Sequence, residues 1–376
     1  MQKDKSIIVW LSSGFFLIFI MVIVGGITRL TDSGLSMVNW SLFMGSIPPL
    51  NEAEWNETFE LYKQSPEFKK INFNYTLEDF KFIFFWEYLH RMIGRLLGLV
   101  FIIPFLYFLI KKRLTKKLKL QSLLLFTLGS LQAFFGWWMV RSGLVDNPHV
   151  SHYRLAVHLT TAFITCGYLL WVLLPLLLPS SNNENKSIFK KIKLLAFLSI
   201  IQIVYGAFIA GLKAGRIYNT WPKMGDQWMP ESVYAMSPVW ANFAEGLAGI
   251  QFVHRTLAIV LLLFTIHIFI FSKKHKLSFM QKRSILLLLV IVLMQMIFGI
   301  LTLVLAYDGQ TMLTSLSGAA AALANVGPGL NEVIGPSGNY SQIKDSSKIF
   351  LSVGMLIGRL ELFPILILLS PLLWRR

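Results

Sequence analysis

Three histidines lie in strongly apolar segments of this chain, and each has an arginine close by. The pairs are His90 with Arg91, His158 with Arg154, and His254 with Arg255. Ionisable groups in a bilayer are costly unless they pair or line a site, so these side chains must point into a helical bundle. Histidines on facing helices hold heme iron in many bundles, and arginines suit the heme propionates. The pattern favours heme over zinc.

A carboxylate shares the helix face of the first histidine. Glu87, His90, Arg91, Gly94 and Gly98 are spaced at i, i+3, i+4, i+7 and i+11, which is one stripe of a helix. The two glycines allow close approach of another helix or of a flat ligand. The alternative for each histidine is a buried polar residue bonded to a backbone carbonyl.

Four further histidines are not expected to belong to this site. His149 and His152 fall in a predicted outer loop, where we expect them to be solvated. His267 and His275 fall towards the opposite side of the membrane.

The elements that position these residues are membrane spans. The 376 residues are 55% hydrophobic and 14% charged, and the mean hydropathy is +0.60, which is too apolar for a soluble domain of this size. Apolar runs long enough to cross a bilayer predict eight helices, near 7–29, 82–110, 120–140, 155–178, 192–212, 247–271, 284–306 and 348–373. The fold class is therefore an all-α integral membrane protein.

The net charge of +16 is explained by topology rather than by nucleic-acid binding. Basic residues precede the first span and follow each even-numbered span, which predicts that both termini are cytoplasmic. The first span is too long for a signal peptide and is predicted to be retained. An Arg-rich leader is not seen, which favours a bacterial cytoplasmic (inner) membrane over a mitochondrial one.

The chain repeats itself. When the chain is aligned with itself at an offset of 181 residues, Gly25 matches Gly206. At an offset of 164 residues, the segment 87–91 matches 251–255. At 163, residues 132–136 match 295–299. We interpret spans one to four and five to eight as two copies of a four-helix unit. Because Gln251 stands where the first copy has Glu87, the asymmetry predicts chemistry in the first half only.

These residues resemble the heme A synthase family, in the mitochondrial and alphaproteobacterial form that lacks an outer cysteine pair. The resemblance covers about residues 7–304. Its most specific segments are GGITRLTDSGLS at 25–36, EYLHR at 87–91, YRLAVH at 153–158, NTWPKM at 219–224 and HR at 254–255.

The resemblance implies a membrane oxidoreductase that converts the C8 methyl of heme O into a formyl group by successive hydroxylations, which gives heme A for cytochrome oxidase. It implies that His90 and His158 hold the substrate heme in the first half, with Arg91 and Arg154 beside it. Glu87 would be the catalytic carboxylate and would accept a proton.

The same resemblance implies that His254 ligates a second, b-type heme that passes electrons, with a histidine partner on the last span. Adding 163 to His158 points to Ala321 instead, and no histidine follows His275. We therefore expect impaired electron delivery in the second half.

From about residue 305 the chain resembles the C-terminal pore repeat of Trk-type potassium transporters, so it looks like a fusion. A short half-helix would lead into a filter segment at 325–329 and a final span. Potassium transport is an alternative function, but such a filter closes from four pore loops and one is present. A non-catalytic b-type heme protein is the other alternative.

The predicted domains are a first repeat at 1–180 with the substrate heme site, a partial second repeat at 181–304 with the b-type heme site, and a Trk-like segment at 305–376. The expected partners are heme O and membrane lipid. Heme O synthase, cytochrome oxidase assembly factors and a second copy of the chain are further candidates.

Overall fold

The computed structural model describes residues 4–38, 47–145, 148–178, 185–324, 329–330, 333–335 and 340–355. Within these ranges the regular structure is helical, apart from a single β-bridge between Met224 and Gln227. Seven of the described helices are long and apolar enough to cross a membrane. The chain is therefore a multi-pass, all-α membrane protein.

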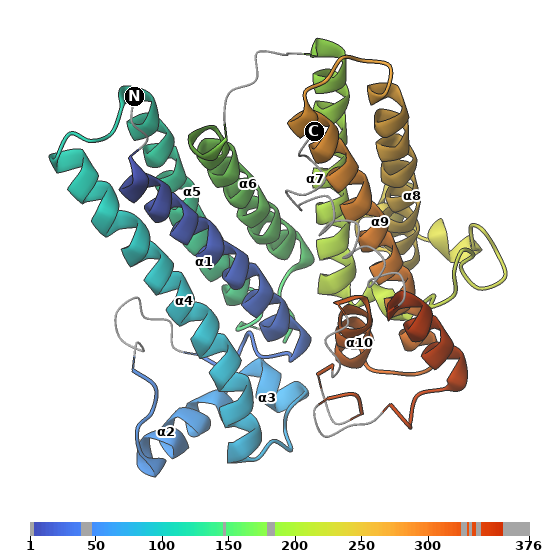
Figure 1. Ribbon diagram of the computed structural model, residues 1–376. Coiled ribbons are helices and arrows are strands. Elements are labelled where there is room, and N and C mark those ends of the chain that lie inside the picture. The colour runs from blue at the N-terminus through green and yellow to red at the C-terminus, as the bar shows by residue number, and fades with distance from the viewer. Residues whose placement is uncertain are drawn as a thin grey trace. The chain divides into compact units, whose positions relative to one another are not determined.

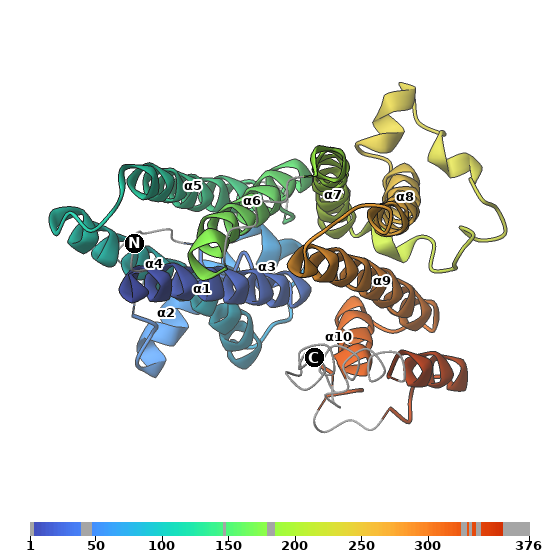
Figure 2. The ribbon, with the colours of Figure 1, turned by 45° about the horizontal axis from the view of Figure 1, so that its top comes forward.

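The chain divides into two compact units, Met1–Asn182 and Asn183–Arg376. The spans of the first unit are α1 (Lys5–Leu30), α4 (Leu77–Ile110), α5 (Lys116–Arg141) and α6 (His152–Leu177). Helix α1 packs on α4 and on α6, and α5 packs on α6 (Figures 1 and 2).

Local sequence signals start and hold these spans. The side chains of Asp4, Thr76 and Thr115 accept hydrogen bonds from the first turns of α1, α4 and α5. Arg113, in the short α4–α5 loop, pairs with Asp4 at 2.6 Å. This pair joins the end of α4 to the start of α1.

The apolar core of the first unit lies towards the end of the bundle that contains this loop. It is formed by buried side chains such as Trp10 and Leu11 of α1, Phe105 and Phe108 of α4, and Leu169 of α6. The polar candidate residues occupy the other half of the bundle, where α1 ends and α4 and α6 begin.

Two short helices, α2 (Glu52–Lys63) and α3 (Pro66–Lys70), lie between α1 and α4 in the chain. Tyr62 is fully buried there, donates to Glu67 at 3.0 Å and accepts from Asn72 at 2.8 Å. Burial and the neighbouring Glu67 carboxylate raise the pKa of Tyr62 above its usual range. Phe80 packs on Tyr62, so this region holds the first turn of α4.

The second unit contains α7 (Lys186–Leu212), α8 (Leu247–Ser272), α9 (Phe279–Tyr307) and the shorter α10 (Met312–Ala324). Three 3-10 turns, η1 (Ala214–Arg216), η2 (Glu231–Val233) and η3 (Val239–Phe243), fill the α7–α8 connection. Helix α8 packs on α7 and α9, and α10 packs on α9. Residues 345–355 are also helical.

Seven of the eight predicted spans match described helices. Of the eighth, predicted near 348–373, the residues up to 355 are helical and the rest lie outside the described residues. Most of the predicted filter segment, 325–328, also lies outside them. Helix α10 occupies the place of α6 in the repeat, but it has 13 residues where α6 has 26.

Candidate active site

The ring of His90 on α4 lies against the backbone of α1. A methyl group added at Gly25 of α1 would stand 2.9 Å from Cε1 of His90, so only glycine leaves room for the ring. The Nδ1 atom of His90 is buried and has no hydrogen-bond partner among the described residues. The imidazole is thus held by packing, with a nitrogen still available to a ligand.

His158 on α6 has the same relation to α5. A methyl group at Gly136 of α5 would stand 3.1 Å from Cε1 of His158. Gln132, one turn earlier on α5, places Nε2 at 3.0 Å from Nδ1 of His158 and donates to its backbone carbonyl at 3.0 Å.

His254 on α8 repeats the arrangement in the second unit. A methyl group at Gly206 of α7 would stand 3.4 Å from Cε1 of His254. Gln202 of α7 places Nε2 at 3.4 Å from Nε2 of His254, and Nδ1 of His254 is buried without a partner among the described residues.

These surroundings fit heme ligation. A ligating histidine usually donates its other ring N–H to an acceptor. Oε1 of Gln202 is buried without a partner among the described residues, and a half-turn of its amide would place that oxygen towards the ring of His254. Within the described residues, no cluster of three or more His, Cys, Asp or Glu side chains suits a bare metal ion.

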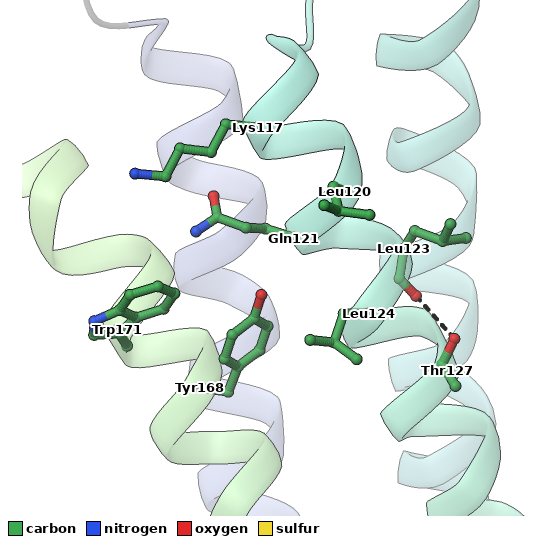
Figure 3. A pocket seen from close by; sticks show the side chains of 8 residues that line it. All are labelled: Lys117, Leu120, Gln121, Leu123, Leu124, Thr127, Tyr168 and Trp171. Atoms are coloured by element: carbon green, nitrogen blue, oxygen red, sulfur yellow. Dashed lines mark hydrogen bonds between the residues drawn. The ribbon is translucent and has the colours of Figure 1, made fainter.

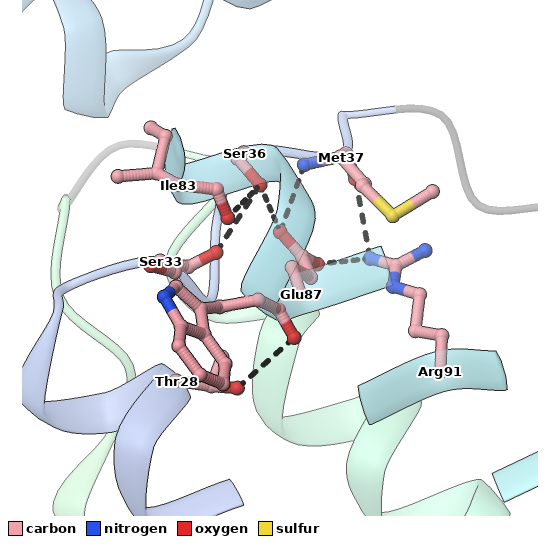
Figure 4. Close-up of polar contacts among 8 residues, drawn as sticks. Thr28, Ser33, Ser36, Met37, Ile83, Glu87 and Arg91 are labelled. Atoms are coloured by element: carbon pink, nitrogen blue, oxygen red, sulfur yellow. Dashed lines mark hydrogen bonds and ion pairs between the residues drawn. The ribbon is translucent and has the colours of Figure 1, made fainter. Parts of the chain in front are cut away.

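Glu87 lies one turn before His90 on α4, is 3% exposed, and accepts hydrogen bonds at both oxygens (Figure 4). Its Oε2 accepts from the Ser36 hydroxyl at 2.7 Å and from the Met37 backbone N–H at 2.9 Å. Its Oε1 accepts from Arg91 at 2.5 Å. Arg91 also donates to the carbonyl of Met37 at 3.2 Å. Two elements therefore hold this carboxylate: α4 and the chain that follows α1.

The second unit holds the corresponding segment differently. Gln251, the counterpart of Glu87, donates to the carbonyl of Tyr218 at 2.8 Å. Arg255, the counterpart of Arg91, donates to the same carbonyl and to that of Thr220 at 2.7 Å. Tyr218 corresponds to Met37 at the offset of 181. Both units thus tie the histidine-bearing span to the same loop position.

The structure places Arg154 against Trp138 of α5. One guanidinium nitrogen donates to the Trp138 carbonyl at 2.7 Å, and the group lies 4.6 Å from the centre of its indole. An arginine has five N–H donors, so those not bound to this carbonyl remain for an anionic group.

Comparison with known proteins bears on this arrangement. A family model described as cytochrome oxidase assembly protein, COX15-CtaA, matches residues 8–326. The chain belongs to this family. The COX15-CtaA match extends past residue 304, where we placed the end of the resemblance, and includes α10.

Individual relatives of this family are similar over most of the chain. A heme A synthase of Flavobacterium psychrophilum is 51% identical over 307 residues, 81% of this chain and 91% of that protein. One of Nitrosospira multiformis is 44% identical over 306 residues, 80% of this chain and 86% of that protein. The heme A synthase COX15 of Arabidopsis thaliana is 48% identical over 271 residues, 68% of this chain and 59% of that protein. No solved structure matches.

One expectation about this COX15-CtaA chain was wrong. His152 is not solvated: it is the first residue of α6, is 8% exposed, and its ring lies 4.0 Å from that of Tyr153. The helix begins earlier than the hydropathy pattern indicated, because polar residues continue its first turn. His149 is exposed, as expected.

A groove of about 500 Å³ lies between α5 and α6 (Figure 3). It is lined by apolar side chains such as Leu124, with Lys117, Tyr168 and Trp171 also on its walls. Tyr168 is about 15 Å along α6 from His158, so this groove contains none of the predicted site residues.

Sequence reasoning missed several contributors to the site. Ser36 and the Met37 backbone bind Glu87, and Gly136 and Gln132 support His158. The internal repeat pointed to two of these residues, because Gln132 and Gly136 match Gln295 and Gly299 in the second copy. Ser36 was quoted only as the end of a motif, since Ile217 replaces it in the second copy.

Proposed function

We propose that this chain is a heme A synthase, a membrane oxidoreductase that oxidises the C8 methyl of heme O to the formyl group of heme A. The observation that carries the proposal is the placement of buried Glu87 one helical turn from His90, whose ring packs against Gly25 of α1. Relatives that share about half of their residues with the chain are named heme A synthases, which supports the same reaction.

In this proposal the substrate heme lies in the first unit between His90 and His158. The glycine opposite each ring fixes the ring by contact, which restricts the position of the iron. Arg91 and Arg154 lie on the same helices and would face the propionates. Arg91 also stabilises Glu87, so its loss would affect both binding and chemistry.

Glu87 is proposed as the proton acceptor in the oxidation of the methyl group. A carboxylate that accepts from a serine hydroxyl, a backbone N–H and an arginine is held in one orientation. It can therefore take a proton at a fixed position without first reorganising.

The second unit is proposed to bind a b-type heme through His254, and that heme would supply electron transfer when bound. Its counterpart to His158 is Ala321 on α10, which has no ligating atom. His254 would thus hold this heme without a histidine at position 321, and we expect slower electron delivery than with two histidines.

The tail keeps a second, separate prediction. It is that the chain from about residue 305 forms a Trk-like pore repeat; the COX15-CtaA match nevertheless extends to residue 326 and includes α10. One such segment does not close a four-fold filter, so potassium transport stays the alternative function. Rescue of growth at low potassium in an uptake-deficient strain would favour it.

The location is proposed to be the bacterial inner membrane, with both termini cytoplasmic, because the basic loops follow the even-numbered spans. Heme O is the proposed substrate. Heme O synthase, cytochrome oxidase assembly factors and a second copy of the chain are proposed partners, with lipid surrounding the exposed apolar faces.

The test is to co-express the chain with a heme O synthase in a host that lacks heme A, and to separate the extracted hemes by chromatography. Heme A in the extract is the expected result. Heme O alone, with the protein present in the membrane and heme bound to it, would contradict the enzyme and favour a non-catalytic b-type heme protein.

A further inference from the structure

Of the contacts around Glu87, some have a counterpart in the second unit and others occur in the first unit alone. The shared part is the arginine: Arg91 donates to the carbonyl of Met37, and Arg255 donates to the carbonyl of Tyr218, its counterpart. This contact attaches a span to the loop before it in either unit. It does not depend on what the unit does.

The part found only in the first unit is a serine and a carboxylate. Ser36 and Glu87 meet at 2.7 Å, while the corresponding positions hold Ile217 and Gln251. The serine and the glutamate therefore differ together between the two copies. A packing role would not require this, because Gln251 reaches the loop without a hydroxyl by donating to a carbonyl.

The direction of the hydrogen bonds explains why the two residues differ together. Gln251 donates to the loop, whereas Glu87 can only accept from it. One backbone N–H, that of Met37, satisfies one lone pair of Oε2, and the Ser36 hydroxyl supplies the second donor. An isoleucine at position 36 would leave Oε2 one donor short in a buried place.

The Ser36 hydroxyl has other acceptors within reach, and their distances show which one it prefers. Its oxygen is 3.2 Å from the Ser33 carbonyl and 3.4 Å from the Ile83 carbonyl, against 2.7 Å from Glu87. A hydroxyl has one proton, and a charged acceptor at the shortest distance takes it. Ser36 is 1% exposed, so water does not replace this bond.

We propose that Ser36 is a positioning residue for the reaction, which acts by anchoring Oε2 of Glu87 so that the other oxygen, Oε1, keeps the orientation that accepts the proton. This inference rests on the proposed function, in which Glu87 is that acceptor. The hydroxyl does not touch the heme in this proposal, and its effect passes through one hydrogen bond.

The test compares Ser36→Ala with Ser33→Ala in purified protein. Ser33 is a matched control, because it is buried in the same loop and its side chain bonds Thr31 rather than Glu87. We expect Ser36→Ala to lower the rate of heme A formation at saturating heme O about tenfold, with heme content and the optical spectrum unchanged. Ser33→Ala should keep the rate. Ser36→Cys, which retains the size and a weaker donor, should lie between serine and alanine.

The outcomes separate this inference from the proposed function. If the unmodified protein makes no heme A, the proposed function fails first. If the unmodified protein makes heme A and the Ser36→Ala variant makes it at the same rate, the positioning role is wrong. A loss of heme or protein with both Ser36→Ala and Ser36→Cys would show a structural role and would also overturn the inference.

Discussion

The two units use one scheme to hold a histidine and different groups to surround it. In each unit a ring packs against a glycine of the neighbouring span, at Gly25 for His90 and at Gly206 for His254. The first unit adds a second such pair, Gly136 with His158, and a buried carboxylate. The second unit has an amide and Ala321 instead. The two units therefore share the packing that holds a histidine and differ in the few side chains proposed to carry the chemistry.

The largest effect is expected when Glu87 is replaced by glutamine, the residue that the second unit has at the corresponding position. Glu87→Gln is expected to lower heme A formation about 10²- to 10⁴-fold, the range for loss of a general base, while heme content is retained. Chromatography of extracted hemes measures the effect. Glu67→Gln, at a buried glutamate of α3, is the control and should stay active. More than a tenth of the activity left in Glu87→Gln would remove Glu87 from the mechanism.

Removing the histidines one at a time tests whether the units bind separate hemes. His90→Ala or His158→Ala should abolish binding of heme O and leave the b-type heme of the second unit. His254→Ala should do the reverse, because its ring packs on α7. The heme-to-protein ratio and the optical spectrum of each variant report this. If all three variants lose the same heme, the assignment of two sites is wrong.

The glycines that contact the histidine rings allow the two units to be compared by smaller changes. Gly25→Ala should disturb its histidine more than Gly206→Ala, because the added methyl group would stand 2.9 Å rather than 3.4 Å from the ring. We expect heme occupancy to fall severalfold in the first variant and little in the second. Gly26→Ala, with no described atom within 4 Å of the added methyl, is the control. Equal effects at Gly25 and Gly26 would exclude ring contact as the cause.

The helix caps should show the smallest effect and no difference between the units. Thr76 caps α4 in the first unit, and Ser278 caps α9 in the second, each within a capping box. Either residue changed to alanine should lower the free energy of unfolding by about 1 kcal/mol. Denaturant unfolding in detergent measures this, and heme A formation should be unchanged. A cap variant that loses activity without losing stability would contradict the separation of framework and chemistry.

Much of the fold was predictable because a bilayer restricts what a chain can do. An apolar run long enough to cross the bilayer must be helical, so seven spans followed from hydropathy. The fourth span was predicted to start near residue 155, but α6 starts at His152, because the polar His152 and Arg154 lie inside its first turn. The short α2 and α3, held by Tyr62 and Glu67, carry no hydropathy signal and were not predicted.

The sequence by itself determined which residues are candidates for the chemistry, since ionisable groups within apolar runs are costly and stand out, as Glu87 and His90 do. It also showed the repeat and the lack of a histidine at position 321. Only the tertiary structure decided what each group touches. Ser36 and Glu87 are 51 positions apart and meet because α1 and α4 pack together. Such contacts depend on how helices pack, a property of the whole bundle that no local pattern contains.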